Sequence, residues 1–306
     1  MSEKTIERPG TGPQEGAEEN RPPAECPAHA KGAPAKGEAQ AAPASEAPAA
    51  CPVDHGALAH EPSLKPVVAV TGASRGIGHA IVRKFYDENW EVYTLSRTPF
   101  SHVCPWAEGY VRHIEVNLSD DRSIQYAIDQ LRERVGEKGL TALINNAGIS
   151  PKNDEGGRLS AMGTPLKIWQ DVHMVNFIAP ALLVQGLKDA LLRGNGSVVN
   201  ITSIAGSRIH PFAGAAYATS KAALSALTRE LAHELAASGI RVNAVAPGEI
   251  LTSILSPGTD EVVEREVPMR RIGDPKEVAE VVHFLCSGAS SYVIGAEINI
   301  DGGQHL

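Results

Sequence analysis

Three side chains in one short stretch could together move a proton. Ser203 ends an apolar run, 197–202, that predicts a buried strand, and Tyr217 and Lys221 lie four residues apart. From Gly214 onward the chain is rich in strong helix formers, so the Tyr and the Lys are expected one turn apart on one helix face. An ammonium beside a phenol favours the phenolate and lowers the tyrosine pKa. Such a tyrosine can exchange a proton with an alcohol or a carbonyl, and the serine hydroxyl could donate to the same oxygen.

The Tyr–Lys spacing has an ordinary interpretation as well. A tyrosine at the edge of a core and a solvated lysine often stand four residues apart on a helix without doing chemistry. What favours chemistry here is a nucleotide-binding pattern upstream in the chain.

That pattern begins at a short β-branched run, Val67–Thr71, which predicts a buried strand. It leads directly into TGASRGIG and then into a helical sequence. This order brings backbone N–H groups and a helix N-terminus against a pyrophosphate. Gly72 would permit the turn, Gly76 the approach of the cofactor and Gly78 the packing of helix on strand. A glycine triplet alone could be a structural turn, and a P-loop is excluded because no Gly-Lys-Ser/Thr follows.

The second predicted strand, Glu91–Ser96, indicates which dinucleotide would bind. It ends in Ser96-Arg97, about twenty residues past the glycines, where an acid would bind the adenosine ribose 2′-hydroxyl and an arginine would accept a 2′-phosphate. Arg75, inside the glycine loop, is a second cation on the same side. These residues predict NADP(H) rather than NAD(H), although Arg97 alone could be a solvated residue at a strand end.

Strands and helices are expected to alternate along the rest of the chain. Further strands are predicted at 111–116, 141–145, 197–202, 240–246 and 295–299, and further helices at about Ser119, which would cap its helix, at 165–192, from Gly214 and from Asp274. Such alternation indicates a parallel sheet. We therefore predict an α/β fold in one domain, residues 63–306: a doubly wound parallel sheet (a Rossmann fold) of seven strands with helices on both faces.

Polar or small residues follow several predicted strands. They are Asn117-Leu118, the NNAG sequence at Asn145–Gly148, and Pro247-Gly248. Side-chain amides beside a glycine suit a tight corner against a cofactor, although NNAG alone could be only a turn. Asn176 falls inside the predicted long helix, where an asparagine usually faces solvent.

Composition narrows the classes of partner and compartment. The 306-residue chain has a net charge of −8 and no run of Lys or Arg, which argues against nucleic acid as a partner. No run of 18 or more apolar residues and no secretory signal are apparent, so no membrane span is expected. The four cysteines form no C-x-x-C pair, which fits a reducing cytoplasm. No metal site is expected.

Residues 1–62 are rich in Ala, Pro, Glu and Gly and contain no aromatic residue. A segment of this kind cannot bury enough apolar surface to order itself, so we predict a disordered tail. Cys-Pro occurs in it twice, as Cys26–His29 and Cys51–His55, which resembles short haem-contacting motifs. Chance occurrence in a proline-rich tail is the simpler interpretation, and a haem- or metal-responsive tail is the alternative.

Taken together, residues 64–306 resemble a classical short-chain dehydrogenase/reductase. The matching motifs are TGASRGIG, NNAG, Asn176, Ser203, YATSK at Tyr217, Pro247-Gly248 and GAEINIDGG near the C-terminus. The order and independence of these motifs make the resemblance specific. One departure is Asn117, where many members of the family carry an Asp that contacts the adenine.

The resemblance implies a role for each matching residue. Tyr217 would be the acid/base catalyst, Ser203 would polarise the substrate oxygen, and Asn176 would position a water in a proton relay. Lys221 would lower the tyrosine pKa and hold the nicotinamide ribose. The implied cofactor-binding residues are Thr71, Gly72, Ser74, Arg75, Gly76, Ile77, Gly78, Ser96, Arg97, Asn117, Leu118, Asn145, Ala147, Gly148, Tyr217, Lys221, Pro247, Gly248, Ile250 and Thr252.

The sequence thus predicts an NADP(H)-dependent oxidoreductase acting on a small-molecule alcohol or carbonyl, and the resemblance implies a homotetramer or homodimer. Three alternatives remain: an NAD-dependent alcohol dehydrogenase, a catalytically silent nucleotide-binding sensor or scaffold, and a regulator acting through the tail. The substrate site would be formed by the segments 251–271, 149–163 and 207–212, whose mixed polarity names no substrate.

Overall fold

The computed structural model describes residues 65–100, 104, 107–252, 255–256 and 258–306. The predicted tail, with its two Cys-Pro motifs, lies outside these residues, and the expectations about it remain predictions.

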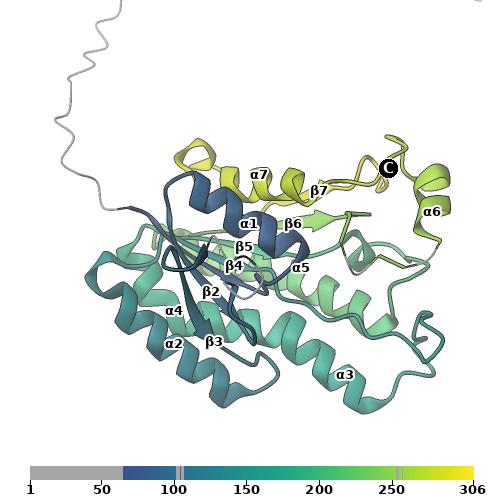
Figure 1. The fold of residues 1–306 in the computed structure, drawn as a ribbon, viewed down its shortest axis with the longest axis horizontal. Helices are drawn as coiled ribbons and strands as arrows, with labels where there is room; N and C mark the ends of the chain where they lie inside the picture. The colour runs from purple at the N-terminus through teal and green to yellow at the C-terminus, as the bar shows by residue number, and fades with distance from the viewer. Residues whose placement is uncertain (1–64, 101–103, 105–106, 253–254, 257) are drawn as a thin grey trace, which may run out of the picture. The chain divides into compact units, whose positions relative to one another are not determined.

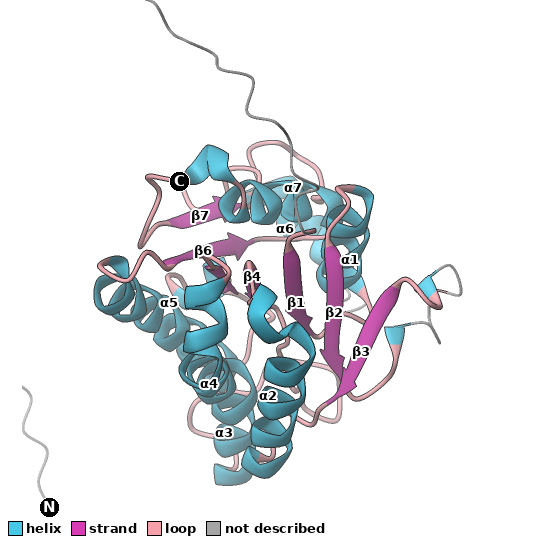
Figure 2. Cartoon of the chain, turned by 90° about the vertical axis from the view of Figure 1, so that its left-hand side faces the viewer, coloured by secondary structure: helices cyan, strands magenta, loops and turns pink. Residues whose placement is uncertain are grey.

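The centre of the domain is a seven-stranded parallel sheet, shown in Figures 1 and 2. Its strand order is β3-β2-β1-β4-β5-β6-β7, and every pair of neighbours is parallel. The strands are β1 Val67–Thr71, β2 Glu91–Ser96, β3 Val111–Glu115, β4 Ala142–Asn145, β5 Ser197–Ile201, β6 Arg241–Pro247 and β7 Glu297–Ile300. The predicted fold class is confirmed. The chain turns from one half of the sheet to the other between β1 and β4, where this class of fold binds its ligands.

Helices cover both faces of the sheet (Figure 2). One face carries α1 (Gly76–Asp87) and α7 (Pro275–Cys286), which bury Phe85 and Val282 against it. The other face carries α2 (Asp121–Val135), α4 (Ala179–Arg193) and α5 (Ala215–Ala236), which bury Leu131, Leu187 and Leu235. The remaining helical segments are η3 Gly136–Lys138, α3 Leu166–His173, η4 Met174–Ile178, η5 Ile204–Gly206, α6 Thr259–Glu266 and η6 Gly288–Ser290.

The predicted long helix at 165–192 is continuous but not uniform. It consists of α3, the π-helical turn η4 and α4, and Asn176 lies in the π-helical turn. A π-turn inside an α-helix adds one residue to the turn and often occurs at a functional site.

Two helix starts test the capping predictions. Asp274 begins α7 as predicted, and it forms a capping box with Glu277. The helix predicted to start at Ser119 instead begins at Asp121, and its cap is Asp120, whose carboxylate accepts from the Ser123 backbone N–H. The prediction of a Ser119 cap was wrong because the hydroxyl of Ser119 donates to the Asn117 side chain.

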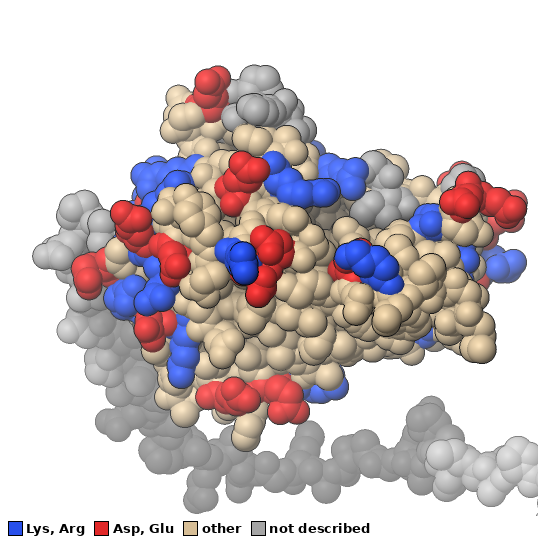
Figure 3. Space-filling model, turned by 90° about the horizontal axis from the view of Figure 1, so that it is seen from below, with Lys and Arg blue, Asp and Glu red and all other residues tan. Residues whose placement is uncertain are grey.

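Among the described residues, the run Leu166–Arg193 is the one helix long and apolar enough to cross a membrane, with a mean hydropathy of 1.3. Half of that window is buried inside the protein, as in the core helix of a globular domain, so it carries no argument for a membrane. On the face shown in Figure 3, positive and negative side chains are interspersed. That face offers no extended basic surface of the kind nucleic acid requires.

Candidate active site

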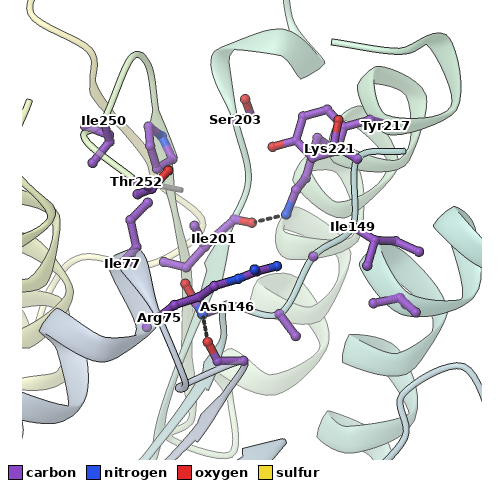
Figure 4. Close-up of a pocket in the computed structure, with 18 of the residues that line it drawn as sticks. Arg75, Ile77, Asn146, Ile149, Ile201, Ser203, Tyr217, Lys221, Ile250 and Thr252 are labelled. Atoms are coloured by element: carbon purple, nitrogen blue, oxygen red, sulfur yellow. Dashed lines mark hydrogen bonds between the residues drawn. The ribbon is translucent and has the colours of Figure 1, made fainter. Parts of the chain in front are cut away.

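A pocket of about 710 Å³ lies at the carboxyl ends of the strands (Figure 4). Most of the residues that the sequence predicts for the site line it: Gly72, Ser74, Arg75, Gly76, Ile77, Gly78, Ser96, Arg97, Asn117, Leu118, Ala147, Gly148, Ser203, Tyr217, Lys221, Pro247, Gly248, Ile250 and Thr252. Thr71, Asn145 and Asn176 are absent from this lining. A nicotinamide dinucleotide and a small substrate are of a size that such a pocket can hold.

The glycine loop fits closely against the end of β4. Gly72 has φ +66°, and a Cβ on it would lie 2.7 Å from the Cα of Ala147. A Cβ on Gly78 would lie 2.4 Å from both the Asn146 amide nitrogen and the Gly72 carbonyl oxygen. Larger residues would therefore displace the loop, whereas glycine leaves the backbone N–H groups at the start of α1 open to the pocket. This cradle fits a pyrophosphate.

Asn146 is the residue that holds this loop, and the sequence reasoning assigned it no role of its own. Its amide nitrogen donates to the carbonyl oxygens of Thr71 and Gly72, at 2.9 and 3.0 Å. The bond between the Asn146 side chain and the glycine loop is drawn in Figure 4. Its place within NNAG was the available signal, but the sequence does not show which of the two amides turns toward the loop.

Thr71 and Asn145, predicted as cofactor-binding residues, have structural partners instead. The Thr71 hydroxyl accepts from the backbone N–H groups of Asn146 and Ala147. The Asn145 amide donates to Asn200 at 2.8 Å, inside the sheet. Both side chains therefore join the ends of neighbouring strands. Thr71 links β1 to the end of β4, and Asn145 links β4 to β5, so the cofactor would rest on strand ends that these bonds hold together.

Ser203 and Tyr217 face each other across the upper part of the pocket in Figure 4. Burial raises the pKa of Tyr217, and the neighbouring Ser203 side chain acts in the opposite direction. Ser203 follows β5, and its hydroxyl caps η5 by accepting from the Ala205 backbone N–H. The two hydroxyls can thus reach one substrate oxygen.

Lys221 lies one turn beyond Tyr217 and is 3% exposed. Its ammonium donates to the Ile201 carbonyl oxygen at 2.6 Å and stands 5.8 Å from the centroid of the tyrosine ring. Burial lowers the pKa of Lys221 to about 8. The expected lowering of the Tyr217 pKa by this ammonium is not seen in this structure, where burial raises the pKa of the phenol.

Asn176 is fully buried and does not face solvent. Its side chain accepts from the Ile149 N–H at 2.8 Å and donates to the Ile149 carbonyl and the Ser220 hydroxyl, each at 3.0 Å. Its amide oxygen and the Lys221 ammonium both lie within 3.6 Å of the position that a Cβ on Gly148 would occupy. The predicted relay partners are therefore close to one another.

At the adenosine end, Ser96 is buried and its hydroxyl donates to the Thr98 carbonyl. Arg75 and Arg97 are exposed at the rim of the pocket. Among the described residues, neither guanidinium has a hydrogen bond or an ion pair. Asn117 departs from the family pattern, but its side-chain oxygen accepts from the backbone N–H and the hydroxyl of Ser119. Asn117 therefore stabilises the turn that follows β3.

Lys152, His210 and Glu249 are among the other polar residues that line the pocket. Lys152 and His210 fall within the segments 149–163 and 207–212, which were predicted as walls of the substrate site, but none of the three was predicted as a site residue. They belong to the loops after β4, β5 and β6. No group of three or more His, Cys, Asp or Glu side chains suited to a metal occurs in the described part of the chain.

Comparison with known proteins assigns the family. A family model described as enoyl-(acyl carrier protein) reductase matches residues 72–305. Protein FixR of Bradyrhizobium diazoefficiens is 53% identical over 241 residues, which cover 78% of this chain and 87% of that protein. The 3-oxoacyl-[acyl-carrier-protein] reductase FabG of Aquifex aeolicus is 35% identical over 253 residues, with 78% and 96% covered. Among solved structures, this chain is similar to a short-chain dehydrogenase/reductase from Brucella ovis in complex with a partially ordered NAD. The two chains are 50% identical, and their structures superpose with a TM-score of 0.67. The match covers 78% of this chain and 100% of that chain.

The chain belongs to the classical short-chain dehydrogenase/reductase family. It is an oxidoreductase of the kind that acts on alcohol and carbonyl groups with a nicotinamide cofactor.

Proposed function

We propose that the protein transfers hydride between NADP(H) and a small alcohol or carbonyl compound. The observation that carries the proposal is a single pocket lined by the glycine loop together with Ser203, Tyr217 and Lys221. When bound, the dinucleotide supplies or accepts the hydride. The glycine loop and the start of α1 would hold its pyrophosphate.

The protein's own groups move the proton. Tyr217 would exchange a proton with the substrate oxygen, and Ser203 would donate a hydrogen bond to that oxygen and fix its position. The buried Lys221 would stabilise the phenolate as it forms, because an opposite charge favours the ionised phenol. Asn176 would position a water that returns protons to the lysine.

The choice of NADP(H) rests on the adenosine end of the pocket. Ser96 places no carboxylate where the 2′-phosphate would lie, and the guanidinium groups of Arg75 and Arg97 are free to bind phosphate oxygens. The Brucella ovis relative was crystallised with NAD, which favours the alternative cofactor.

The test compares kcat/KM for NADPH and NADH in the parent and in a Ser96→Asp, Arg97→Ala variant. We expect the parent to prefer NADPH and the variant to shift toward NADH by on the order of tenfold or more, as charge-assisted hydrogen bonds are worth about 1.5–3 kcal/mol each. An Arg122→Ala variant, which removes an exposed arginine on α2, is the control. A parent that prefers NADH, or a variant with unchanged preference, would contradict the assignment.

We also propose that the protein works as a homotetramer or homodimer in the cytoplasm. The family resemblance supports the first statement, and the scattered cysteines, which form no C-x-x-C pair, support the second.

A further inference from the structure

Three loops contribute polar side chains to the pocket that Tyr217 lines. Lys152, His210 and Glu249 all line the same pocket as Tyr217 and Ser203. The exposed fraction is 7% for Glu249 and 12% for the His210 side chain. Buried polar groups in a pocket are unfavourable unless a partner satisfies them.

Hydrogen bonds fix the state of His210. Its Nδ1 accepts from the Phe212 backbone N–H at 3.2 Å, so this nitrogen carries no proton. The proton is therefore on Nε2, which donates to a Glu249 carboxylate oxygen at 2.6 Å. The imidazole is neutral, and it holds the negative charge of Glu249 in place.

Lys152 is the cation of this group. Its ammonium donates to the Phe212 carbonyl oxygen and forms no ion pair with any carboxylate in the described residues. Burial lowers the pKa of Lys152, and the charge of Glu249 acts in the opposite direction and favours the ammonium. An ammonium has three donors, so two remain for a ligand. A half-buried ammonium whose one hydrogen bond among the described residues goes to a neutral carbonyl would be stabilised further by a directly bound anion.

The position of Lys152 limits how far that anion can lie from the reacting carbon. Phe212, which accepts its hydrogen bond, stands just before α5, and Tyr217 is in the first turn of that helix. A group bound to Lys152 and a substrate oxygen held by Tyr217 would therefore share one pocket, which both residues line. A short acid can place its carboxylate and its reacting carbon in one pocket, whereas an acyl thioester on a carrier protein has its charged groups at the far end of a long arm.

We propose that the substrate is a short hydroxy or oxo carboxylic acid whose carboxylate binds Lys152 while its reacting carbon faces Ser203 and Tyr217. This inference rests on the proposed function and names its class of substrate. The charge of Glu249 favours the ammonium, and His210 accepts from the backbone N–H of Phe212, whose carbonyl oxygen in turn accepts from Lys152.

The test measures oxidation of 2-hydroxybutanoate, 3-hydroxybutanoate and 4-hydroxypentanoate, and of their methyl esters, by the full-length protein with both cofactors at 340 nm. For the best acid, kcat/KM should exceed that of its ester by on the order of 10- to 100-fold, the value of one charge-assisted hydrogen bond. The Lys152→Met variant should lose this preference through a raised KM and keep its activity on the ester.

Lys167→Met is the matched control, since Lys167 also lines the pocket but is paired with Asp171. It should keep the preference for the acid. The acid-to-ester ratio of the parent tests the inference even if the Lys152 variant does not fold.

Failure of this inference and failure of the proposed function would give different results. Equal or better turnover of the esters, or of a long-chain 3-oxoacyl thioester of N-acetylcysteamine in the reverse direction, would overturn the inference and leave the proposed function standing. A parent that turns over no alcohol or carbonyl compound with either cofactor would overturn both.

Discussion

Burial acts on Tyr217 and Lys221 in the same sense, because it favours the neutral form of each. It raises the pKa of the phenol and lowers that of the ammonium to about 8. A lysine with a lowered pKa still carries its charge below about pH 8, and it loses that charge as the pH rises through this value. The charged Lys221 can therefore favour a phenolate on Tyr217 below about pH 8, and it supports the phenolate less well in alkaline solution.

Removing the phenolic hydroxyl tests the central role of Tyr217. A Tyr217→Phe variant should lose about 10²–10⁴-fold in kcat, the usual contribution of a general acid or base. Its affinity for the cofactor, measured by fluorescence titration, should stay within about twofold because the glycine loop is untouched. Tyr126→Phe, on the exposed side of α2, is the control and should behave like the parent. Retention of most of the activity by Tyr217→Phe would show that another group transfers the proton.

At the scale of elements, the close contact between the first turn of α1 and the end of β4 determines the shape of the cofactor site. Asn146 joins them, and Gly78 leaves no room for a side chain. Cofactor affinity should therefore depend on Gly78, although this residue contributes only its backbone.

A Gly78→Ala variant should weaken cofactor binding by tenfold or more, as measured by titration calorimetry. The added methyl would overlap the Asn146 amide and the Gly72 carbonyl, and the loop would have to move. Gly288→Ala is the matched control, because a Cβ there meets nothing within 4 Å. Unchanged affinity in Gly78→Ala would mean that the loop does not hold the cofactor.

The elements themselves were largely predictable from the sequence. The buried strands β1 and β5 are β-branched runs between turn residues, and this signal is local. The π-helical turn at Asn176 was not predictable, since its side chain is satisfied by Ile149 and Ser220, 27 and 44 residues away along the chain. The cap at Asp120 was missed because Ser119 and Asp120 are equally good caps by type, and only the fold shows which one the helix uses.

At the scale of the whole molecule, the sequence motifs predicted the cofactor half of the pocket better than the substrate half. The glycine loop and the Tyr–Lys pair are contiguous patterns with a chemical meaning of their own. Lys152, His210 and Glu249 stand on three separate loops, and each alone is an ordinary polar residue. Only the parallel arrangement of β4, β5 and β6 brings their following loops to one edge of the sheet.

The last prediction concerns the N-terminal segment, and it follows from where the core lies. The chain divides into two units at residue 58, and the two buried clusters of the described residues extend from Val67 to Cys286. Deleting residues 1–60 should therefore leave the melting temperature within about 2 °C and kcat/KM within about twofold of the full-length values, because the sequence of this segment has no core-forming pattern. Circular dichroism melting and the 340 nm assay on both forms measure this. An insoluble or inactive truncated protein would show that the segment takes part in folding or catalysis.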